Sequence, residues 1–418
     1  MDSDVAIIGG GPSGLWAAYC LTQKEPSCVV TLYERNSDVG SKLLLSGASQ
    51  CNVTHNTSSD EMRDHYYDKK EFLRKAFSLL GPQHTMNVLK GLGLALLIRP
   101  DNKVFPSSLQ AQDVKDLLKQ RCLNNKVNFC YNTRILSISK EGEDFMFTDQ
   151  HNHSHKAHQV IIATGGLTYP QTGSTGDGYV LAQQMGHSLI APRPALRPLP
   201  LKHKELTALA GLSVEKVILS DQKQNTTCGA LLITHSGLSG PAALHLSHYI
   251  HSETTITINW LAEPYTEKQL TNHILTLCNE KGSSQLATII HSLNIPKNLV
   301  DYLLDKAGIN HAQKAAEVGK KSLQKIVPLL LKDQYMIADT FDVHKAMVTT
   351  GGVNTEEVDD QTMESKKERG LYFCGEVLDI DGESGGYNLQ VAFSTATAAT
   401  LGECPKEDIL SILLPDKR

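Results

Sequence analysis

A glycine cluster near the start of the chain has the residue types and the spacing that bind a phosphate group. The stretch "VAIIGGGPSG" places Gly9, Gly11 and Gly14 in a GxGxxG pattern. The first glycine permits a tight turn after a strand, the second lets a pyrophosphate approach the backbone, and the third lets the next helix pack closely. The pattern predicts a dinucleotide whose phosphates lie at the helix N-terminus, where N–H groups and the helix dipole favour anions. Pro12 and Ser13 belong to the same predicted site.

An acidic residue at the expected distance supports this interpretation. A second strand-like run, "CVVTLYE", ends at Glu34, twenty residues after Gly14. A carboxylate at this position binds the ribose hydroxyls of an adenosine and disfavours the 2′-phosphate of NADP. We therefore predict that Glu34 and the adjacent Arg35 contact the cofactor.

Three later stretches favour FAD over NAD as that cofactor. They are "VGSKLLLSGASQCNVTH" from Val39, "HQVIIATGG" from His158 and "GLYFCGEVLDIDGESGGYNLQ" from Gly370. The last predicts a helix whose N-terminus directs N–H groups at a flavin ring and stabilises negative charge on the reduced flavin. Glu376 is the candidate for the ribityl hydroxyls. The other predicted FAD contacts are Lys42, Ser46, Gly47, Thr164, Gly165, Gly375, Gly386, Tyr387, Asn388 and Leu389.

The order of predicted elements indicates how these residues are positioned. Strand-like and helical runs alternate up to about residue 190, which is typical of a parallel sheet covered by helices. A proline-rich stretch, "PRPALRPLPL", then introduces short β segments and a later helical region, before "FDVHKAMVTTGGVN" returns to the first pattern. The predicted fold class is α/β, with a discontinuous Rossmann-type FAD-binding domain and an inserted domain that is β-barrel-like and then helical. The predicted boundaries are 1–195 and 341–418 for the FAD domain and 196–340 for the insertion, which is mainly β over 196–265 and mainly helical over 266–336.

Two residues are candidates for catalysis. Cys51 lies in "GASQCNVTH", where its thiol could donate a proton, form a charge-transfer contact or act as a redox group. The competing interpretation is a small packing residue beneath the flavin. His235 lies in "ITHSGLSGPAAL", either as part of a loop that starts a helix or as an acid brought over the flavin by the insertion.

Composition sets limits on location and partners. The 418 residues include nine cysteines without a CxxC pair, which predicts reduced thiols, no disulfide framework and no metal site. Met1 leads almost directly into the first predicted strand, and we find no apolar run long enough for a membrane span. We therefore expect a cytoplasmic protein. The formal net charge of −5 argues against a broad nucleic-acid footprint and slightly favours a small-molecule substrate.

At these motifs the sequence resembles the HI0933-like family of NAD(P)/FAD-dependent oxidoreductases, the BaiN and YhiN type. The resemblance runs nearly the whole length, through "GGGPSG", "SKLLLSGASQCNVTH", "ATGGLTYPQTGSTGDGY", "THSGLSGPAAL", "TTGGVNT" and the stretch from Gly370. It implies non-covalently bound FAD and the two-dinucleotide-binding type of flavoprotein fold. The chain departs from the family pattern at Ser41 and Gln50, where the family has arginines, and at His55, where it has asparagine.

The resemblance also implies a reaction type. It indicates reduction of a C=C bond by an FAD-dependent enzyme, with NAD(P)H as a transient electron donor because the chain has no second GxGxxG motif. Activities in the family include reduction of unsaturated steroid acids and of uridine in ribosomal RNA, so a small molecule and ribosomal RNA both remain candidate substrates. A flavin-binding protein without turnover is a further alternative, because of the two missing arginines. The lysines at 306, 314, 320, 321, 325 and 332 form either a solvated face or an RNA-contacting face.

Overall fold

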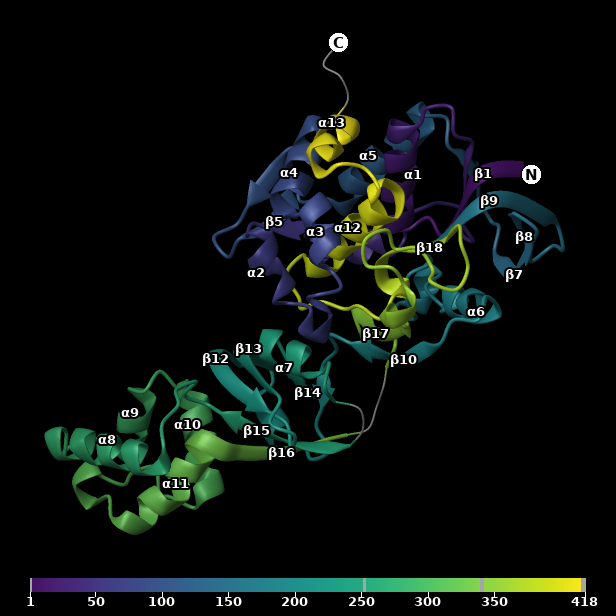
Figure 1. The fold of residues 1–418 in the computed structure, drawn as a ribbon. Coiled ribbons are helices and arrows are strands. Elements are labelled where there is room, and N and C mark those ends of the chain that lie inside the picture. The colour runs from purple at the N-terminus through teal and green to yellow at the C-terminus, as the bar shows by residue number, and fades with distance from the viewer. Residues whose placement is uncertain (1, 251–252, 339–341, 415–418) are drawn as a thin grey trace. The chain divides into compact units, whose positions relative to one another are not determined.

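The chain folds into two compact units. The computed structural model describes residues 2–250, 253–338 and 342–414 (Figure 1). The first unit consists of Met1–Pro194 and Val343–Arg418, and the second unit consists of Ala195–Asp342. Each unit has its own buried core of apolar side chains.

A mostly parallel sheet forms the centre of the first unit. Its strand order is β6-β2-β1-β9-β8-β7, and β18 also pairs with β9. The pairings of β1 with β2 and β9, of β2 with β6, and of β9 with β18 are parallel, so these strands end at one edge of the sheet. The strands are β1 (Asp2–Ile8), β2 (Val30–Tyr33), β6 (Asn128–Cys130), β7 (Ile135–Glu141), β8 (Asp144–Asp149), β9 (Ser154–Ile162) and β18 (Leu371–Phe373).

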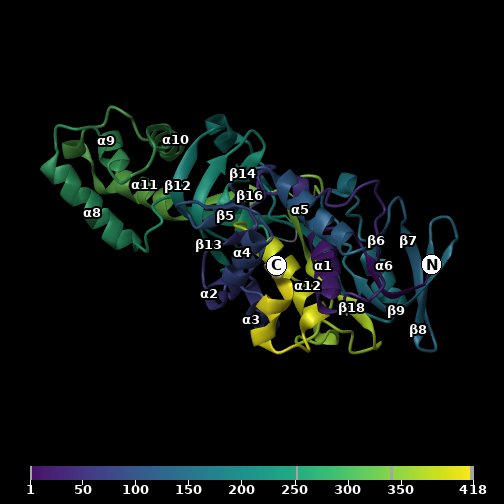
Figure 2. The same ribbon diagram turned by 90° about the horizontal axis from the view of Figure 1, so that it is seen from above.

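Two buried helices from opposite ends of the chain pack together beside this sheet. They are α1 (Pro12–Lys24) and α12 (Tyr387–Leu401), and Figure 2 shows them next to each other. The Trp16 indole donates a hydrogen bond to Thr397 Oγ1 at 2.8 Å, and its ring lies 4.8 Å from that of Phe393. The alanines and threonines of α12 permit this close approach, because their side chains are small.

The rest of the first unit surrounds the sheet. A small sheet has the order β3-β5-β4, and β10 pairs with β17. These strands are β3 (Thr54–His55), β4 (Leu96–Ile98), β5 (Lys103–Pro106), β10 (Leu189–Ala195) and β17 (Val348–Val353). The helices are α2 (Ser59–Arg63), α3 (Arg74–Leu79), α4 (Pro82–Gly91), α5 (Ala111–Asn124), α6 (Asp177–Gln184) and α13 (Ile409–Leu413).

The second unit joins an antiparallel sheet to a group of helices. The strand order is β11-β14-β13-β12-β15-β16. The strands are β11 (Leu199–Pro200), β12 (Ser213–Ser220), β13 (Thr226–Ile233), β14 (Gly237–Ser239), β15 (Thr254–Asn259) and β16 (Asp333–Ile337). The helices are α7 (Pro241–Leu246), α8 (Glu267–Glu280), α9 (Leu286–His291), α10 (Lys297–Ala307) and α11 (Lys320–Lys332). The predicted α/β fold class, a Rossmann-type domain with an insertion that is first β and then helical, is confirmed.

The region 266–336, predicted to be mainly helical, ends in a strand. The helices end at Lys332, and residues 333–336 belong to β16, which pairs with β15. Side chains in this strand alternate between buried and exposed, as the two-residue period of a strand requires. Asp333 is buried because Lys306, Trp260 and Tyr335 all donate hydrogen bonds to it.

Candidate cofactor site

The glycine cluster forms the turn between β1 and α1. Gly9 has φ +111°, a conformation that favours glycine, and it lets the chain turn directly after Ile8. A Cβ at Gly14 would lie 1.9 Å from the Gly9 carbonyl oxygen, so only glycine allows this contact between helix and turn. A Cβ at Gly11 would meet no atom within 4 Å. The turn therefore has open space beside Gly11, at the start of α1, where a phosphate group fits.

Glu34 lies beside this turn. It directly follows β2, and its side-chain oxygens accept hydrogen bonds of 2.8 Å from the N–H groups of Gly10 and Asn36. Burial raises the pKa of the Glu34 carboxyl, while those two hydrogen bonds act in the opposite direction. A carboxylate has about four acceptor positions, so the oxygens can still accept hydrogen bonds from ribose hydroxyls.

Arg35 is held by an acidic partner. Its guanidinium pairs with Asp177 at 3.0 Å, and the same carboxylate binds Arg134 at 2.6 Å. Asp177 is the first residue of α6. The prediction that Arg35 contacts the cofactor stays a prediction, because Asp177 already fixes this guanidinium.

The structure brings Lys42 and Glu376 together. The Lys42 ammonium lies 2.7 Å and 2.9 Å from the two oxygens of Glu376 and donates a hydrogen bond to Thr168 at 2.9 Å. The N–H of Thr349 donates a hydrogen bond to Glu376 at 2.8 Å. The sequence motifs predicted two separate cofactor contacts here, but they did not predict the ion pair or the roles of Thr168 and Thr349.

The loop after Lys42 has a strained backbone. Gly47, Ala48, Ser49 and Cys51 all have φ between +55° and +66°. Three of them are not glycine, and such residues cost free energy in this conformation, which is often found at functional sites. The hydroxyl of Ser46 holds the start of the loop by donating a hydrogen bond to Leu43 O at 2.7 Å.

A guanidinium does reach this loop, although Gln50 stands where the family has an arginine. Arg99, which directly follows β4, donates a hydrogen bond of 2.6 Å to the Gln50 side chain. The guanidinium also lies 4.0 Å from the centre of the Phe105 ring. Arg99 was not singled out in the sequence, because a separation of 49 residues gives no local signal.

The Cys51 side chain is fully buried. Burial raises the pKa of its thiol to about 12, and a hydrogen bond with Ser46 opposes this only partly. A thiol with this pKa stays protonated at neutral pH, so burial argues against the charge-transfer and redox roles, which need a thiolate. Proton donation and packing remain open for Cys51.

The ends of β9 and β18 complete the wall beside the glycine turn. Thr164 follows β9, and its hydroxyl is buried without a hydrogen-bond partner among the described residues. Gly165 has φ +71°, and a Cβ at Gly375 would lie 2.6 Å from Ser13 Oγ. A buried hydroxyl of this kind is costly unless it is bonded, which favours a ligand at this position.

The first residues of α12 determine which groups at the start of this helix can bind a ligand. Gly386, with φ +98°, precedes the helix, and the first N–H groups of a helix have no partner within it. The Asn388 side chain binds both backbone groups of Gly382, at 2.9 and 2.8 Å, so it holds the preceding loop. The N–H groups of Tyr387, Asn388 and Leu389 are therefore better candidates for a ligand than the Asn388 side chain.

Two histidines that the sequence analysis did not assign to the site surround Tyr387. The ring of His65 stacks on Tyr387 at 4.3 Å and that of His55 at 5.4 Å. His65 also pairs with Glu383 at 2.7 Å. The motif from Val39 ends at His55, but only the fold shows that His65 lies beside it.

The second candidate catalytic residue belongs to the second unit. His235 is exposed on the connection between β13 and β14. Its catalytic role stays a prediction. Within the described part of the chain, no cluster of three or more possible metal ligands is present, and no helix is long and apolar enough to cross a bilayer.

These residues fit FAD. The open space at Gly11 suits the pyrophosphate, Glu34 suits the ribose, and the orphaned Thr164 hydroxyl and the start of α12 suit further polar groups of the cofactor. All of them belong to the first unit.

Comparison with known proteins shows which family and which relatives the chain is similar to. The model described as HI0933-like protein Rossmann domain matches residues 3–402. The chain is 30% identical over 410 residues to a ribosomal RNA dihydrouridine synthase of Haemophilus influenzae, covering 96% of this chain and 98% of the relative. It is also 30% identical over 407 residues to a 3-dehydro-bile acid delta(4,6)-reductase of Clostridium scindens, covering 94% and 97%. A solved structure of 3-ketosteroid delta1-dehydrogenase from Sterolibacterium denitrificans aligns with 98% of this chain and 99% of its own, at 12% identity and a TM-score of 0.49.

Proposed function

This chain belongs to the HI0933-like family of FAD-dependent oxidoreductases, as its motifs predicted, and from that premise we propose that it reduces a C=C bond with NAD(P)H as electron donor. The observation that carries the proposal is the glycine turn with open space at Gly11 beside the buried carboxylate of Glu34. FAD, when bound, would accept a hydride from NAD(P)H and pass it to one carbon of the substrate double bond.

The residues of the first unit would bind and orient the cofactor. Gly9, Gly11 and Gly14 leave room for the pyrophosphate, and the start of α1 supplies N–H groups to it. Glu34 would accept hydrogen bonds from the adenosine ribose. The start of α12 would place its positive dipole end beside the flavin pyrimidine and favour negative charge there.

The ion pair of Lys42 and Glu376 would hold the flavin-facing side of the site. Glu376 already accepts hydrogen bonds from Lys42, Thr168 and Thr349, so its carboxylate has a fixed orientation. The remaining acceptor capacity of Glu376 suits ribityl hydroxyls. The Lys42 ammonium, held by this carboxylate, would add positive charge near the ring.

The second carbon of the reduced double bond needs a proton. Cys51 is a candidate as a neutral thiol, since burial keeps its proton in place at neutral pH. His235 is the other candidate, because its ring is exposed to solvent and to ligands. If Cys51 donates the proton, Cys51→Ala should lose the protonation step. If His235 donates it, His235→Gln should lose that step instead.

The relatives suggest two classes of substrate. The Clostridium scindens relative is named for a 3-dehydro-bile acid, and the Haemophilus influenzae relative for a dihydrouridine in ribosomal RNA. Both names describe the reduction of a C=C bond. A ribosomal RNA substrate is thus the second candidate, and a flavin-binding protein without turnover is a weaker one, because Arg99 brings a guanidinium to Gln50.

Anaerobic titration tests the reaction. NADH or NADPH should bleach the yellow absorption of the purified protein, and an unsaturated 3-oxo bile acid or a ribosomal RNA fragment should then restore it. Cys51→Ala and His235→Gln should both bleach normally, and the variant that lacks the proton donor should recover about 10²–10⁴-fold more slowly. A yellow protein that neither nucleotide bleaches would show that NAD(P)H is not the electron donor. A variant whose absorption recovers at the normal rate would show that the replaced residue is not the proton donor.

A further inference from the structure

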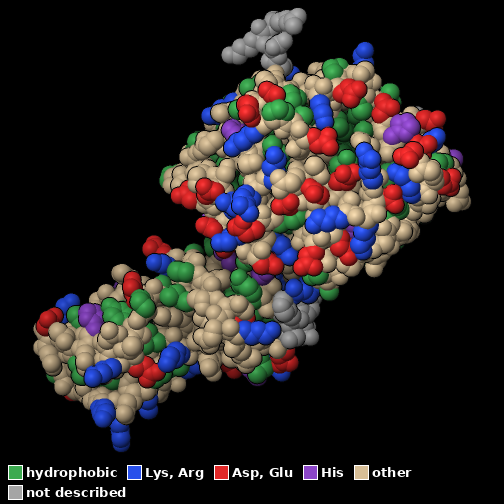
Figure 3. Space-filling view, viewed as in Figure 1, with side chains coloured by type: hydrophobic (Ala, Val, Ile, Leu, Met, Phe, Trp, Pro, Cys, Tyr) green, Lys and Arg blue, Asp and Glu red, His purple; other side chains and the backbone are tan. Residues whose placement is uncertain are grey.

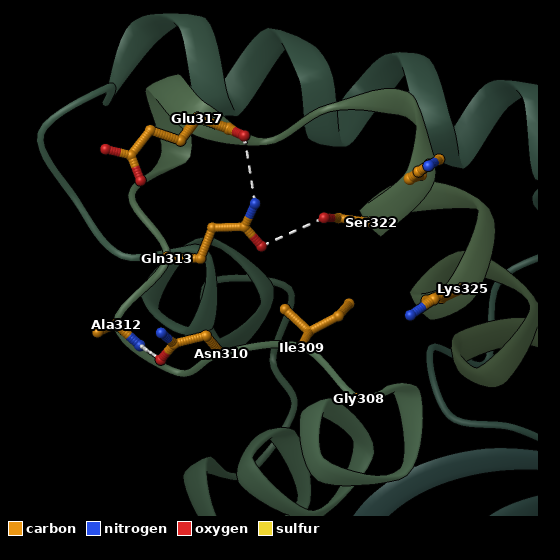
Figure 4. A pocket seen from close by; sticks show the side chains of 9 residues that line it. Gly308, Ile309, Asn310, Ala312, Gln313, Glu317, Ser322 and Lys325 are labelled. Carbon is orange, nitrogen blue, oxygen red and sulfur yellow. Dashed lines mark hydrogen bonds between the residues drawn. The ribbon is translucent and has the colours of Figure 1, made fainter.

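A polar hollow lies in the second unit, within the helical group. It has a volume of about 370 Å³ and is formed by the end of α10, the segment after it and the first turns of α11 (Figure 4). Ile309 and Ala312 are its only apolar lining residues; the others are Gly308, Asn310, Gln313, Glu317, Lys321, Ser322 and Lys325. Such a lining has little to offer a steroid-like molecule, which needs apolar contact surface.

The segment that forms the hollow is strongly basic. Residues 306–332 contain six lysines and a single acidic residue, Glu317. Lys306 pairs with Asp333, and Lys332 pairs with Glu267. For the other four lysines, 314, 320, 321 and 325, no ion pair is found with any described residue, and all four are exposed. Figure 3 shows basic side chains gathered over the region of α11.

Two of these lysines line the hollow itself. The Lys325 ammonium lies 3.9 Å from the position of a Cβ at Gly308, and in Figure 4 it points into the hollow. The Lys321 side chain lines the same space. The Glu317 carboxylate lies on the other side of the hollow from Lys325 (Figure 4), and no ion pair joins these two described residues.

Neutral donors complete the lining. Ser322 donates a hydrogen bond to the Gln313 side chain at 3.2 Å, and that amide donates one to Glu317 O at 3.2 Å. These bonds hold the side chains at the rim of the hollow. Gly319 precedes α11, whose first N–H groups lack acceptors within the helix, although the N–H of Ser322 already donates to Gly319 O at 3.1 Å.

We propose that this hollow, with Lys321 and Lys325, binds a backbone phosphate of an RNA substrate. Two ammonium groups are suited to one phosphate. Lys314 and Lys320 extend the charge beyond it, as a strand with one phosphate per nucleotide requires. The acidic net charge of the whole chain does not oppose RNA binding, because the basic residues are concentrated in one segment. The proposal rests on the RNA alternative of the proposed function and names its anchoring site.

The test compares two double variants of the full-length yellow protein. Lys321→Gln/Lys325→Gln removes both charges of the hollow, and Lys216→Gln/Lys223→Gln removes two exposed lysines of the same unit outside it. The affinity for a fluorescein-labelled, structured ribosomal RNA fragment is measured by anisotropy between about 50 and 200 mM salt. The hollow variant should bind at least about 10-fold more weakly at low salt, and its plot of log K against log salt should flatten by about 0.7–0.9, the change expected for one lost phosphate contact. The control variant should stay within about 2-fold of the wild type.

Each outcome decides the proposal. Equal losses of RNA affinity in both variants, or an unchanged affinity in the hollow variant, would show that the hollow is not the binding site. A wild type that does not bind RNA at about 50 mM salt would show that RNA is not the ligand. Lys321→Arg/Lys325→Arg should retain binding, which separates lost charge from a folding defect. Competition by inorganic phosphate or AMP as strong as that by RNA would assign the hollow to small phosphates and overturn the RNA assignment. Flavin content and bleaching by NADPH, measured in the same samples, report on the proposed oxidoreductase function independently.

Discussion

Replacing Gly11 with valine should give a folded protein that contains almost no flavin. The backbone of Gly11, with φ −75° and ψ −175°, is one that valine adopts readily, and a Cβ there meets no protein atom within 4 Å. The new side chain would instead fill the space that the pyrophosphate needs. The check is the ratio of flavin to protein absorbance, together with the melting temperature. The affinity for FAD should fall at least about 100-fold, since a steric block and the loss of N–H contacts exceed about 2.7 kcal/mol. The flavin ratio of the purified variant should therefore be close to zero.

Gly11→Ala provides the graded control. The smaller side chain should weaken FAD binding less than valine does and should leave the melting temperature close to that of the wild type. A valine variant that purifies as yellow as the wild type would show that the cofactor lies elsewhere.

Replacing Gly14 with alanine should have the opposite signature, with a large loss of stability. The added Cβ would lie 1.9 Å from the Gly9 carbonyl oxygen and 3.1 Å from its carbon, and both are backbone atoms that cannot rotate away. The start of α1 would have to move from β1, at a cost of about 2–3 kcal/mol or more. Denaturant unfolding of the FAD-free proteins, followed by circular dichroism, measures this cost.

The alanine variant of Gly11 is again the matched control, because it adds the same atom one turn earlier. Equal stability of the Gly11→Ala and Gly14→Ala variants would contradict the packing role of Gly14. Measuring both variants without FAD keeps a change in FAD affinity from being counted as a change in packing.

The glycine turn and Glu34 could be predicted from the sequence because they depend on local order. A strand, a turn, a helix and a second strand follow one another within 34 residues, and a parallel pairing brings the ends of both strands to one edge. The start of α12 has a similar local signal, since two glycines mark the change from loop to helix.

The contacts that depend on distant parts of the chain could not be predicted. Lys42 and Glu376 are 334 residues apart, and only the shared sheet edge brings them together. The Asn388 side chain turns back to Gly382, because the preceding loop needs its amide. The burial of Cys51, which keeps its thiol neutral, is likewise a property of the packed loop and not of the motif.

The identity of the flavin released from the purified protein tests the central claim most directly. The protein should be yellow, and heat denaturation should release FAD, because only a dinucleotide supplies both the pyrophosphate for the turn at Gly11 and the ribose for Glu34. Chromatography of the supernatant against FAD and FMN standards makes the measurement. Release of FMN, or a colourless protein that cannot be reconstituted with FAD yet binds NAD tightly, would contradict the account.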